Sequence, residues 1–277
     1  MTLLQALFLG ILQGLTEFLP ISSSGHLVLA ELLLNIHIAP QDMQGLNTLL
    51  HAGTLLALLI IYSETWIAFA KAPFNNDKHH TTKLVLLVIA TIPGAITGFL
   101  LEDWIANHFQ ILICVGLAFG VTGLILLLGE CCPSNKQSVW HRLLHPTESE
   151  PRKLTTRSSF FIGFAQALAL IPGLSRSGLT ISAGRMMGLE RKDALDFSFL
   201  MAVPIIAGAS VLAVLDLLTG ELKLPSLQIT TVAVATSFIS SFVAIIFLRK
   251  FVVSRSLAWF TPYLFVVSAI TIFLSLQ

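Results

Sequence analysis

Polar residues suited to phosphate chemistry interrupt the apolar N-terminal stretch of this sequence. Gln13 and Glu17 are four residues apart, which places both on one face of a helix. The turn after Pro20 then carries Ser22, Ser23, Ser24, Gly25 and His26. Hydroxyls and free N–H groups at the start of a helix bind anions, and a carboxylate within an apolar segment needs a metal ion or an arginine as its partner. His26 adds a group that exchanges a proton near neutral pH.

A second apolar stretch ends in a similar turn. This turn reads Pro172, Gly173, Leu174, Ser175, Arg176, Ser177, Gly178, Leu179 and Thr180. A guanidinium group binds phosphate oxygens in a bidentate manner, so the two turns together predict one site for a phosphate ester or diphosphate with a divalent metal ion. Glu17 would bind the metal, which prefers oxygen ligands, and Arg176 would stabilise charged oxygens in the transition state. His26 or a serine would be the nucleophile or the acid and base.

The same residues also have structural interpretations. Glu17 and Arg176 could form a purely structural ion pair, and the serines could only cap helices. His51 lies on the polar face of a later apolar stretch, where a histidine is more often a packing residue, so we do not assign it to the site. Glu31 is expected to face a cavity or an interface. Three Gly-x-x-x-Gly pairs indicate close helix packing: Gly10 with Gly14, Gly94 with Gly98, and Gly116 with Gly120.

The composition indicates a helical membrane protein. Of 277 residues, 55% are hydrophobic and 11% are charged, against roughly 25% charged residues in a soluble domain. The mean hydropathy is +0.84. These values exclude a soluble globular enzyme and a disordered chain, and the net charge of +1 provides no basic excess for a nucleic-acid backbone. Long continuous apolar runs disfavour a β-barrel.

Six apolar stretches are long enough, or nearly so, to cross a core of about 30 Å as helices. They cover about residues 46–62, 84–101, 111–129, 197–218, 228–248 and 257–276. Residues 3–19 and 159–171 are too short to cross and end at Pro20 and Pro172. We therefore predict two re-entrant helix-turn-helix segments, at about 3–38 and about 159–189.

Loop charges and self-similarity both predict an inverted-topology repeat. Lys and Arg gather in loops 63–83, 130–158 and 249–256, which places these loops in the cytoplasm and both termini outside. A shift of 153 residues superimposes seven identities, namely Phe8, Gly10, Gln13, Leu15, Ser22, Ser24 and Gly25 on Phe161, Gly163, Gln166, Leu168, Ser175, Ser177 and Gly178. The predicted repeats are 1–129 and 159–277, joined by a cytoplasmic linker at 130–158, with the working site where the two breaks meet.

Over essentially its whole length, the chain resembles the bacterial undecaprenyl-diphosphate phosphatases, also called bacitracin resistance proteins. The resemblance lies in the two motifs quoted above, from Gln13 to His26 and from Pro172 to Thr180. It implies a multi-pass enzyme of the inner membrane. The loop charges and the segment 1–45, which has no Lys or Arg, predict a site that opens to the outer face, and the position of both breaks near the midplane leaves access from either face open. This enzyme would hydrolyse undecaprenyl diphosphate to undecaprenyl phosphate and inorganic phosphate, which recycles the lipid carrier for peptidoglycan and other envelope glycans. Because bacitracin sequesters the substrate rather than binding the protein, more enzyme would confer resistance.

The resemblance also implies residue roles and a divalent cation, Mg²⁺ or Ca²⁺. Glu17 is the expected metal ligand or activating carboxylate, and Ser23 and His26 are the nucleophile and acid–base candidates. The expected diphosphate-binding residues are Gln13, Ser22, Ser24, Gly25, Gly173, Ser175, Arg176, Ser177 and Thr180. Many members have Glu where this chain has Gln13. Compared with Glu, Gln13 keeps an oxygen ligand for the metal but lacks the negative charge.

Inverted repeats with broken helices are also typical of transporters. A polyprenyl-phosphate flippase or a small-anion carrier is therefore the alternative function.

Overall fold

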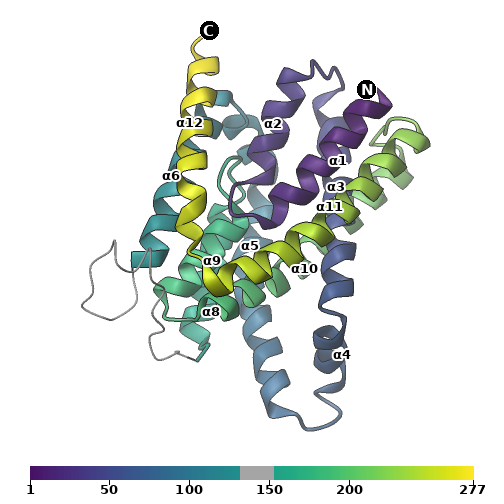
Figure 1. The fold of residues 1–277 in the computed structure, drawn as a ribbon. Helices are drawn as coiled ribbons and strands as arrows, with labels where there is room; N and C mark the ends of the chain where they lie inside the picture. The colour runs from purple at the N-terminus through teal and green to yellow at the C-terminus, as the bar shows by residue number, and fades with distance from the viewer. Residues whose placement is uncertain (132–152) are drawn as a thin grey trace.

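The computed structural model describes residues 1–131 and 153–277, so most of the predicted linker lies outside the described residues. Every regular element in these two ranges is a helix (Figure 1). The helices are α1 (Leu3–Phe18), α2 (Ser23–Leu33), α3 (Pro40–Ile61), α4 (Ser63–Lys71), α5 (Lys78–Phe109), α6 (Leu112–Cys131), α8 (Thr156–Leu168), α9 (Arg176–Met186), α10 (Arg191–Thr219), α11 (Leu227–Ser254), η1 (Leu257–Phe260) and α12 (Thr261–Ser275).

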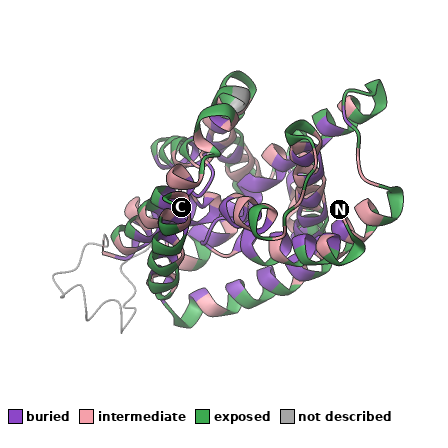
Figure 2. Ribbon diagram, turned by 90° about the horizontal axis from the view of Figure 1, so that it is seen from above, coloured by how far each residue is buried: buried purple, intermediate pink, exposed green. Residues whose placement is uncertain are grey.

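Six helical segments are long and apolar enough to cross a membrane, which confirms the predicted polytopic all-α fold. They are α3, α5, α6, α10, α11 and the segment Leu257–Ser275 that joins η1 to α12. Figure 2 shows buried residues on the inner faces of the bundle and exposed residues around its periphery. Many exposed residues are large and apolar, such as Phe99, Leu218 and Val253. A surface of this kind is stable against lipid rather than water.

Helix α5 begins earlier and ends later than the stretch 84–101 expected from hydropathy. The side chain of Asp77 accepts hydrogen bonds from the N–H groups of His79 and His80 and so caps the helix before its apolar part begins. Loop 63–83 also contains the short helix α4. Hydropathy detects only apolar stretches, so it did not predict the polar ends of α5 or the short helix α4.

Short helices α1 and α2 pack against each other, and α8 and α9 form a second such pair. Ser22, at the start of α2, has a φ of 71°, which is uncommon for a residue with a side chain. Gly173, before α9, has a φ of 94°, and a Cβ atom there would lie 2.6 Å from the carbonyl oxygen of Val115. Both chain reversals therefore depend on unusual backbone conformations immediately before a helix begins.

Each short pair packs against a long helix from the other half of the chain. Helix α1 runs along α11, and α8 runs along α5. Glycines permit both contacts, since an added Cβ at Gly10 would lie 2.3 Å from the carbonyl oxygen of Ala233, and one at Gly163 would lie 2.2 Å from that of Ala90. This reciprocal exchange is the arrangement expected of two related halves, whereas their opposite orientation in the membrane stays a prediction.

The glycine pairs divide into packing and non-packing positions. Gly10 and Gly14 approach α11, and Gly116 and Gly120 approach α12, as predicted. At Gly98, however, an added Cβ would meet nothing within 4 Å. The packing interpretation of Gly98 was therefore wrong, and this glycine lines a cavity instead.

Candidate active site

The two Ser-rich turns meet inside the bundle. The Ser22 hydroxyl donates to the carbonyl oxygen of Leu174 at 3.4 Å, and the Ser177 hydroxyl donates to that of Leu19 at 3.1 Å. Each turn therefore binds the backbone of the other turn. The convergence expected from the sequence is present in the structure.

Both turns use serine in the same way to begin a helix. Ser22 accepts a hydrogen bond from the N–H of Gly25 at 3.4 Å, and Ser175 accepts one from that of Gly178 at 3.1 Å. Each of these serines also lies close to the second serine of its turn, 3.3 Å from Ser24 in the first turn and 3.2 Å from Ser177 in the second. Helix capping thus accounts for Ser22 and Ser175, while the N–H groups at the start of α2 and α9 remain features suited to anions.

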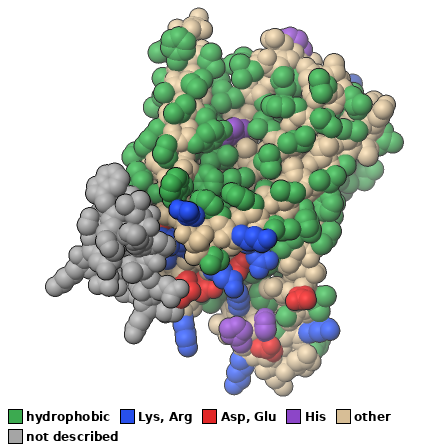
Figure 3. Space-filling view, in the orientation of Figure 1, with side chains coloured by type: hydrophobic (Ala, Val, Ile, Leu, Met, Phe, Trp, Pro, Cys, Tyr) green, Lys and Arg blue, Asp and Glu red, His purple; other side chains and the backbone are tan. Residues whose placement is uncertain are grey.

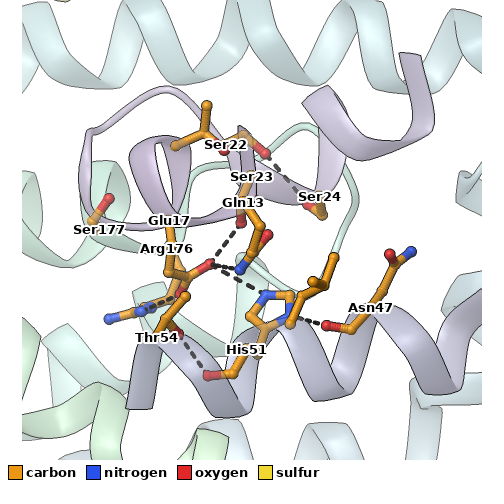
Figure 4. Close-up of polar contacts among 12 residues, drawn as sticks. Gln13, Glu17, Ser22, Ser23, Ser24, Asn47, His51, Thr54, Arg176 and Ser177 are labelled. Carbon is orange, nitrogen blue, oxygen red and sulfur yellow. Dashed lines mark hydrogen bonds and ion pairs between the residues drawn. The ribbon is translucent and has the colours of Figure 1, made fainter. Parts of the chain in front are cut away.

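Glu17 is the centre of the polar contacts in Figure 4. Its Oε1 accepts a hydrogen bond from Nη2 of Arg176 at 2.5 Å. Its Oε2 is contacted by the Ser23 hydroxyl at 2.6 Å, by Nε2 of Gln13 at 3.1 Å and by Nε2 of His51 at 3.2 Å. The Glu17 side chain is only 6% exposed. A carboxylate buried to this degree is stable only with charged and hydrogen-bonding partners, and Glu17 has both.

Helix α10 holds Arg176 from the other side. Nη1 of Arg176 donates to the carbonyl oxygen of Ser198 at 3.4 Å. The Thr180 hydroxyl lies 2.6 Å from the Ser198 hydroxyl and also donates to the carbonyl oxygen of Arg176 at 2.7 Å. Thr180 and Ser198 therefore orient the arginine. Ser198 was absent from the predicted site.

His51 belongs to this centre, so its exclusion at the sequence level was wrong. Its Nδ1 contacts the carbonyl oxygen of Asn47 at 2.7 Å, which requires a proton on Nδ1. Its Nε2 points at Glu17, and the side chain is 27% exposed. The signal was present in the sequence, because Gln44, Asn47, Thr48 and His51 form a polar i, i+3, i+4, i+7 face on α3.

His26 has different partners. Its Nδ1 lies 2.6 Å from the carbonyl oxygen of Ser22, and its Nε2 lies 2.6 Å from the Tyr263 hydroxyl. The ring stacks on Tyr263 and meets Phe119 edge-on. Both ring nitrogens are thus occupied without Glu17 or Arg176, and the catalytic role of His26 stays a prediction. Sequence analysis did not identify Tyr263, because it lies on α12, far away in the chain.

A cavity of about 970 Å³ adjoins this centre between α2, α3, α5 and α10. Helices α2 and α3 contribute most of its polar side chains, together with apolar ones such as Leu27 and Met43; the polar side chains are Ser24, Glu31, Gln44, Asn47, Thr48 and His51. The residues that α5 and α10 contribute form a mostly apolar wall, which includes Gly98, Phe99, Pro204, Gly208 and Leu212. Glu31 faces this cavity, as expected, and accepts a hydrogen bond from Nδ2 of Asn47 at 2.9 Å. Since His51 both lines the cavity and contacts Glu17, it connects the two.

The residues that could hold a divalent cation are few. Within the described ranges, no group of three or more His, Cys, Asp or Glu side chains has suitable spacing. The predicted ligands offer the Glu17 carboxylate and Oε1 of Gln13, which is buried with no hydrogen-bond partner. This pair fits Mg²⁺ in the manner common at phosphate sites, where one or two protein oxygens act with water and substrate phosphates.

Comparisons with known proteins agree with the two motifs. The family model described as "Bacitracin resistance protein BacA" matches residues 6–270. The chain is 37% identical over 264 residues to the undecaprenyl-diphosphatase of Pelotomaculum thermopropionicum, which covers 95% of this chain and 93% of that protein. It is 36% identical to undecaprenyl-diphosphatase 1 of Shouchella clausii, over 99% of this chain and 96% of that protein. On this basis the chain belongs to the bacitracin resistance protein BacA family.

Proposed function

We propose that the protein is an undecaprenyl-diphosphatase, which hydrolyses undecaprenyl diphosphate to undecaprenyl phosphate and inorganic phosphate. The observation that carries this proposal is the buried contact of Glu17 with Arg176 and Ser23 beside a cavity that has polar side chains on α2 and α3 and an apolar wall on α5 and α10. The names of relatives that align over nearly their full length support it. The reaction recycles the lipid carrier of envelope glycans, and higher levels of the enzyme raise resistance to bacitracin.

The cavity accommodates an amphipathic substrate. In this proposal the diphosphate binds near the polar side chains His51 and Ser24, and the first part of the prenyl chain lies against Gly98 and Gly208 on the apolar wall; all four residues line the cavity. An added Cβ at either glycine would meet nothing within 4 Å, so both leave open space there. The cavity is the size of a site for one drug-sized ligand. The remainder of a chain as long as undecaprenyl extends into the membrane.

Ser23 is better placed than His26 for nucleophilic attack, because its hydroxyl already donates to Glu17. Attack by Ser23 Oγ on the terminal phosphorus transfers the hydroxyl proton to Glu17 and breaks the P–O bond to undecaprenyl phosphate. Water then hydrolyses the phosphoserine and releases inorganic phosphate. Substrate oxygens that bind Arg176 compete with Glu17 for its guanidinium group, which frees the carboxylate to accept the proton. A bound Mg²⁺ or Ca²⁺ would neutralise negative charge on the diphosphate.

The basic loops favour the inner membrane, with both termini outside and the cavity open to the outer face. Transport of a polyprenyl phosphate or another anion remains the alternative function, with the repeat as its only support.

Phosphate release from undecaprenyl diphosphate by the purified full-length protein tests this proposal, with EDTA and with added Mg²⁺ or Ca²⁺. We expect release that depends on the cation and is lost in Glu17→Gln. Folded wild-type protein that releases no phosphate, yet moves polyprenyl phosphate across proteoliposome membranes, would favour transport instead.

A further inference from the structure

A second cavity lies between α10 and α11. Its volume is about 450 Å³, and its lining residues are Lys192, Leu195, Ile246, Arg249, Lys250 and Val253. It shares no lining residue with the larger cavity. Three of the six side chains are cationic and three are apolar. This mixture is unusual in a chain in which charged residues make up only 11%.

Helical spacing brings these residues together. Ile246, Lys250 and Val253 follow the i, i+4, i+7 pattern, so they share one face of α11. Lys192 and Leu195 are three residues apart and share one face of α10. The cavity is thus formed where two regular helix faces meet, and its cations have fixed backbone positions.

The charges around this cavity are only partly compensated. Nε of Arg249 lies 3.7 Å from Oδ1 of Asp196, and its guanidinium group lies 5.2 Å from the centre of the Tyr62 ring. The Tyr62 hydroxyl in turn donates to Asp196 at 2.5 Å. Within the described part of the chain, Lys192 and Lys250 form no ion pair, and Asp193 does not line the cavity. Counted over the lining residues and the ion-pair partner of Arg249, three cations and one carboxylate give a net charge of +2.

The cavity lies where the apolar surface ends. Figure 3 shows Lys and Arg side chains gathered at one end of the molecule, next to a broad hydrophobic surface. On α11, Ile246 is 40% exposed, Phe247 49% and Val253 70%, so apolar side chains flank Lys250 on the outside of the bundle. Lipid head groups lie at this boundary, and basic pockets between membrane helices bind anionic head groups.

We propose that this cavity is a binding site for the phosphate head group of an acidic phospholipid from the surrounding membrane. The two unpaired lysines and Arg249 bind the head group, and the acyl chains lie along the exposed apolar face of α11. A lipid fits better than free phosphate, because half of the lining is apolar and gains nothing from a fully hydrated anion. This site is independent of the proposed hydrolysis.

Binding of fluorescent phosphatidylglycerol to the purified full-length protein in detergent tests the site. The variant Lys192→Gln/Lys250→Gln removes both unpaired charges with little change in size. We expect its affinity to fall about 25-fold, because each lysine near an anionic surface contributes about fivefold. The control Lys71→Gln/Lys78→Gln makes the same charge change at α4 and α5, outside the cavity, and is expected to change the affinity less than twofold.

Three outcomes would overturn the proposal. An equal loss of affinity in the control would show diffuse attraction rather than a site. Equal competition by unlabelled phosphatidylcholine would remove the need for a net negative head group, and displacement of the lipid by inorganic phosphate would indicate a free-anion site. Lys192→Arg/Lys250→Arg keeps both charges, so it must keep the affinity, whatever the glutamine variant does to folding.

Discussion

The two Ser-rich turns share a serine helix cap but differ in the backbone conformation of that serine and in their chemistry. Ser22 and Ser175 cap equivalent helices, and the next position is Ser23 in the first turn and Arg176 in the second. Both of these residues contact the same carboxylate, Ser23 through Oε2 of Glu17 and Arg176 through Oε1. The repeat therefore supplies the scaffold twice, and the reaction centre arises where the two copies differ.

Asymmetry also distinguishes the short helices that precede the turns. The position equivalent to Glu17 in the second half is Leu170. Gln13 donates to Glu17, whereas both polar side-chain atoms of its counterpart Gln166 are buried without a partner. Gln166 packs against Gly94 on α5. One copy of the helix thus carries the charged centre, and the other copy packs against α5.

The largest expected effect comes from removal of the carboxylate at which the two halves meet. Glu17→Gln should lower kcat/KM for undecaprenyl diphosphate by at least about 100-fold, the scale for loss of a preorganised transition-state group. Glu64→Gln makes the same charge change at an exposed position of α4, outside the cavity, so it is the matched control and should change kcat/KM less than threefold. A similar loss in both variants would show that the effect does not depend on the position of Glu17.

A smaller effect is expected at His51, the residue of α3 that joins Glu17 to the cavity. His51→Gln keeps a hydrogen-bond donor but removes the imidazole, and we expect a loss of about tenfold in kcat/KM. His108→Gln, at an exposed position near the end of α5, provides the control and should have no effect. Normal kinetics in His51→Gln would assign this residue to packing alone.

The apolar wall can be tested by a graded series at Gly98. Gly98→Ala should leave the KM for undecaprenyl diphosphate nearly unchanged, because open space surrounds this position, whereas Gly98→Leu should raise it several-fold. Hydrolysis of a short prenyl diphosphate should change less, since its chain reaches less of the wall. A full effect in the alanine variant would instead indicate that the flexibility of glycine matters.

The smallest expected effects are those of the two serine helix caps, which both turns share. Ser22→Ala and Ser175→Ala each remove a helix cap, and each should lower the free energy of unfolding by about 1 kcal/mol. Thermal unfolding in detergent measures the loss of stability, and Ser226→Ala, at the cap of α11, is the variant for comparison. A much larger loss in one of the two turns would show that the caps are not equivalent.

Hydropathy and spacing were sufficient to predict the all-α fold, the six spanning helices and the two turns, because these depend on local patterns. They failed at Tyr263, which reaches the site from a distant helix. At His51 the polar face of α3 was visible in the sequence, but its contact with Glu17 was not. Gly98 and Gly116 illustrate the same limit, since they occur in identical motifs, yet only Gly116 has a helix packed against it. Whether a small residue meets a neighbour or a cavity depends on tertiary structure.

The most direct test of the shared centre is a double-mutant cycle between the two turns, with Ser23→Ala, Arg176→Lys and the double variant. The measured quantity is kcat/KM for undecaprenyl diphosphate, with thermal unfolding as the check on folding. If both residues act through Glu17 as one unit, the double variant should be little worse than the worse single variant. Fully additive losses would mean that the two turns act independently, which would contradict a single reaction centre.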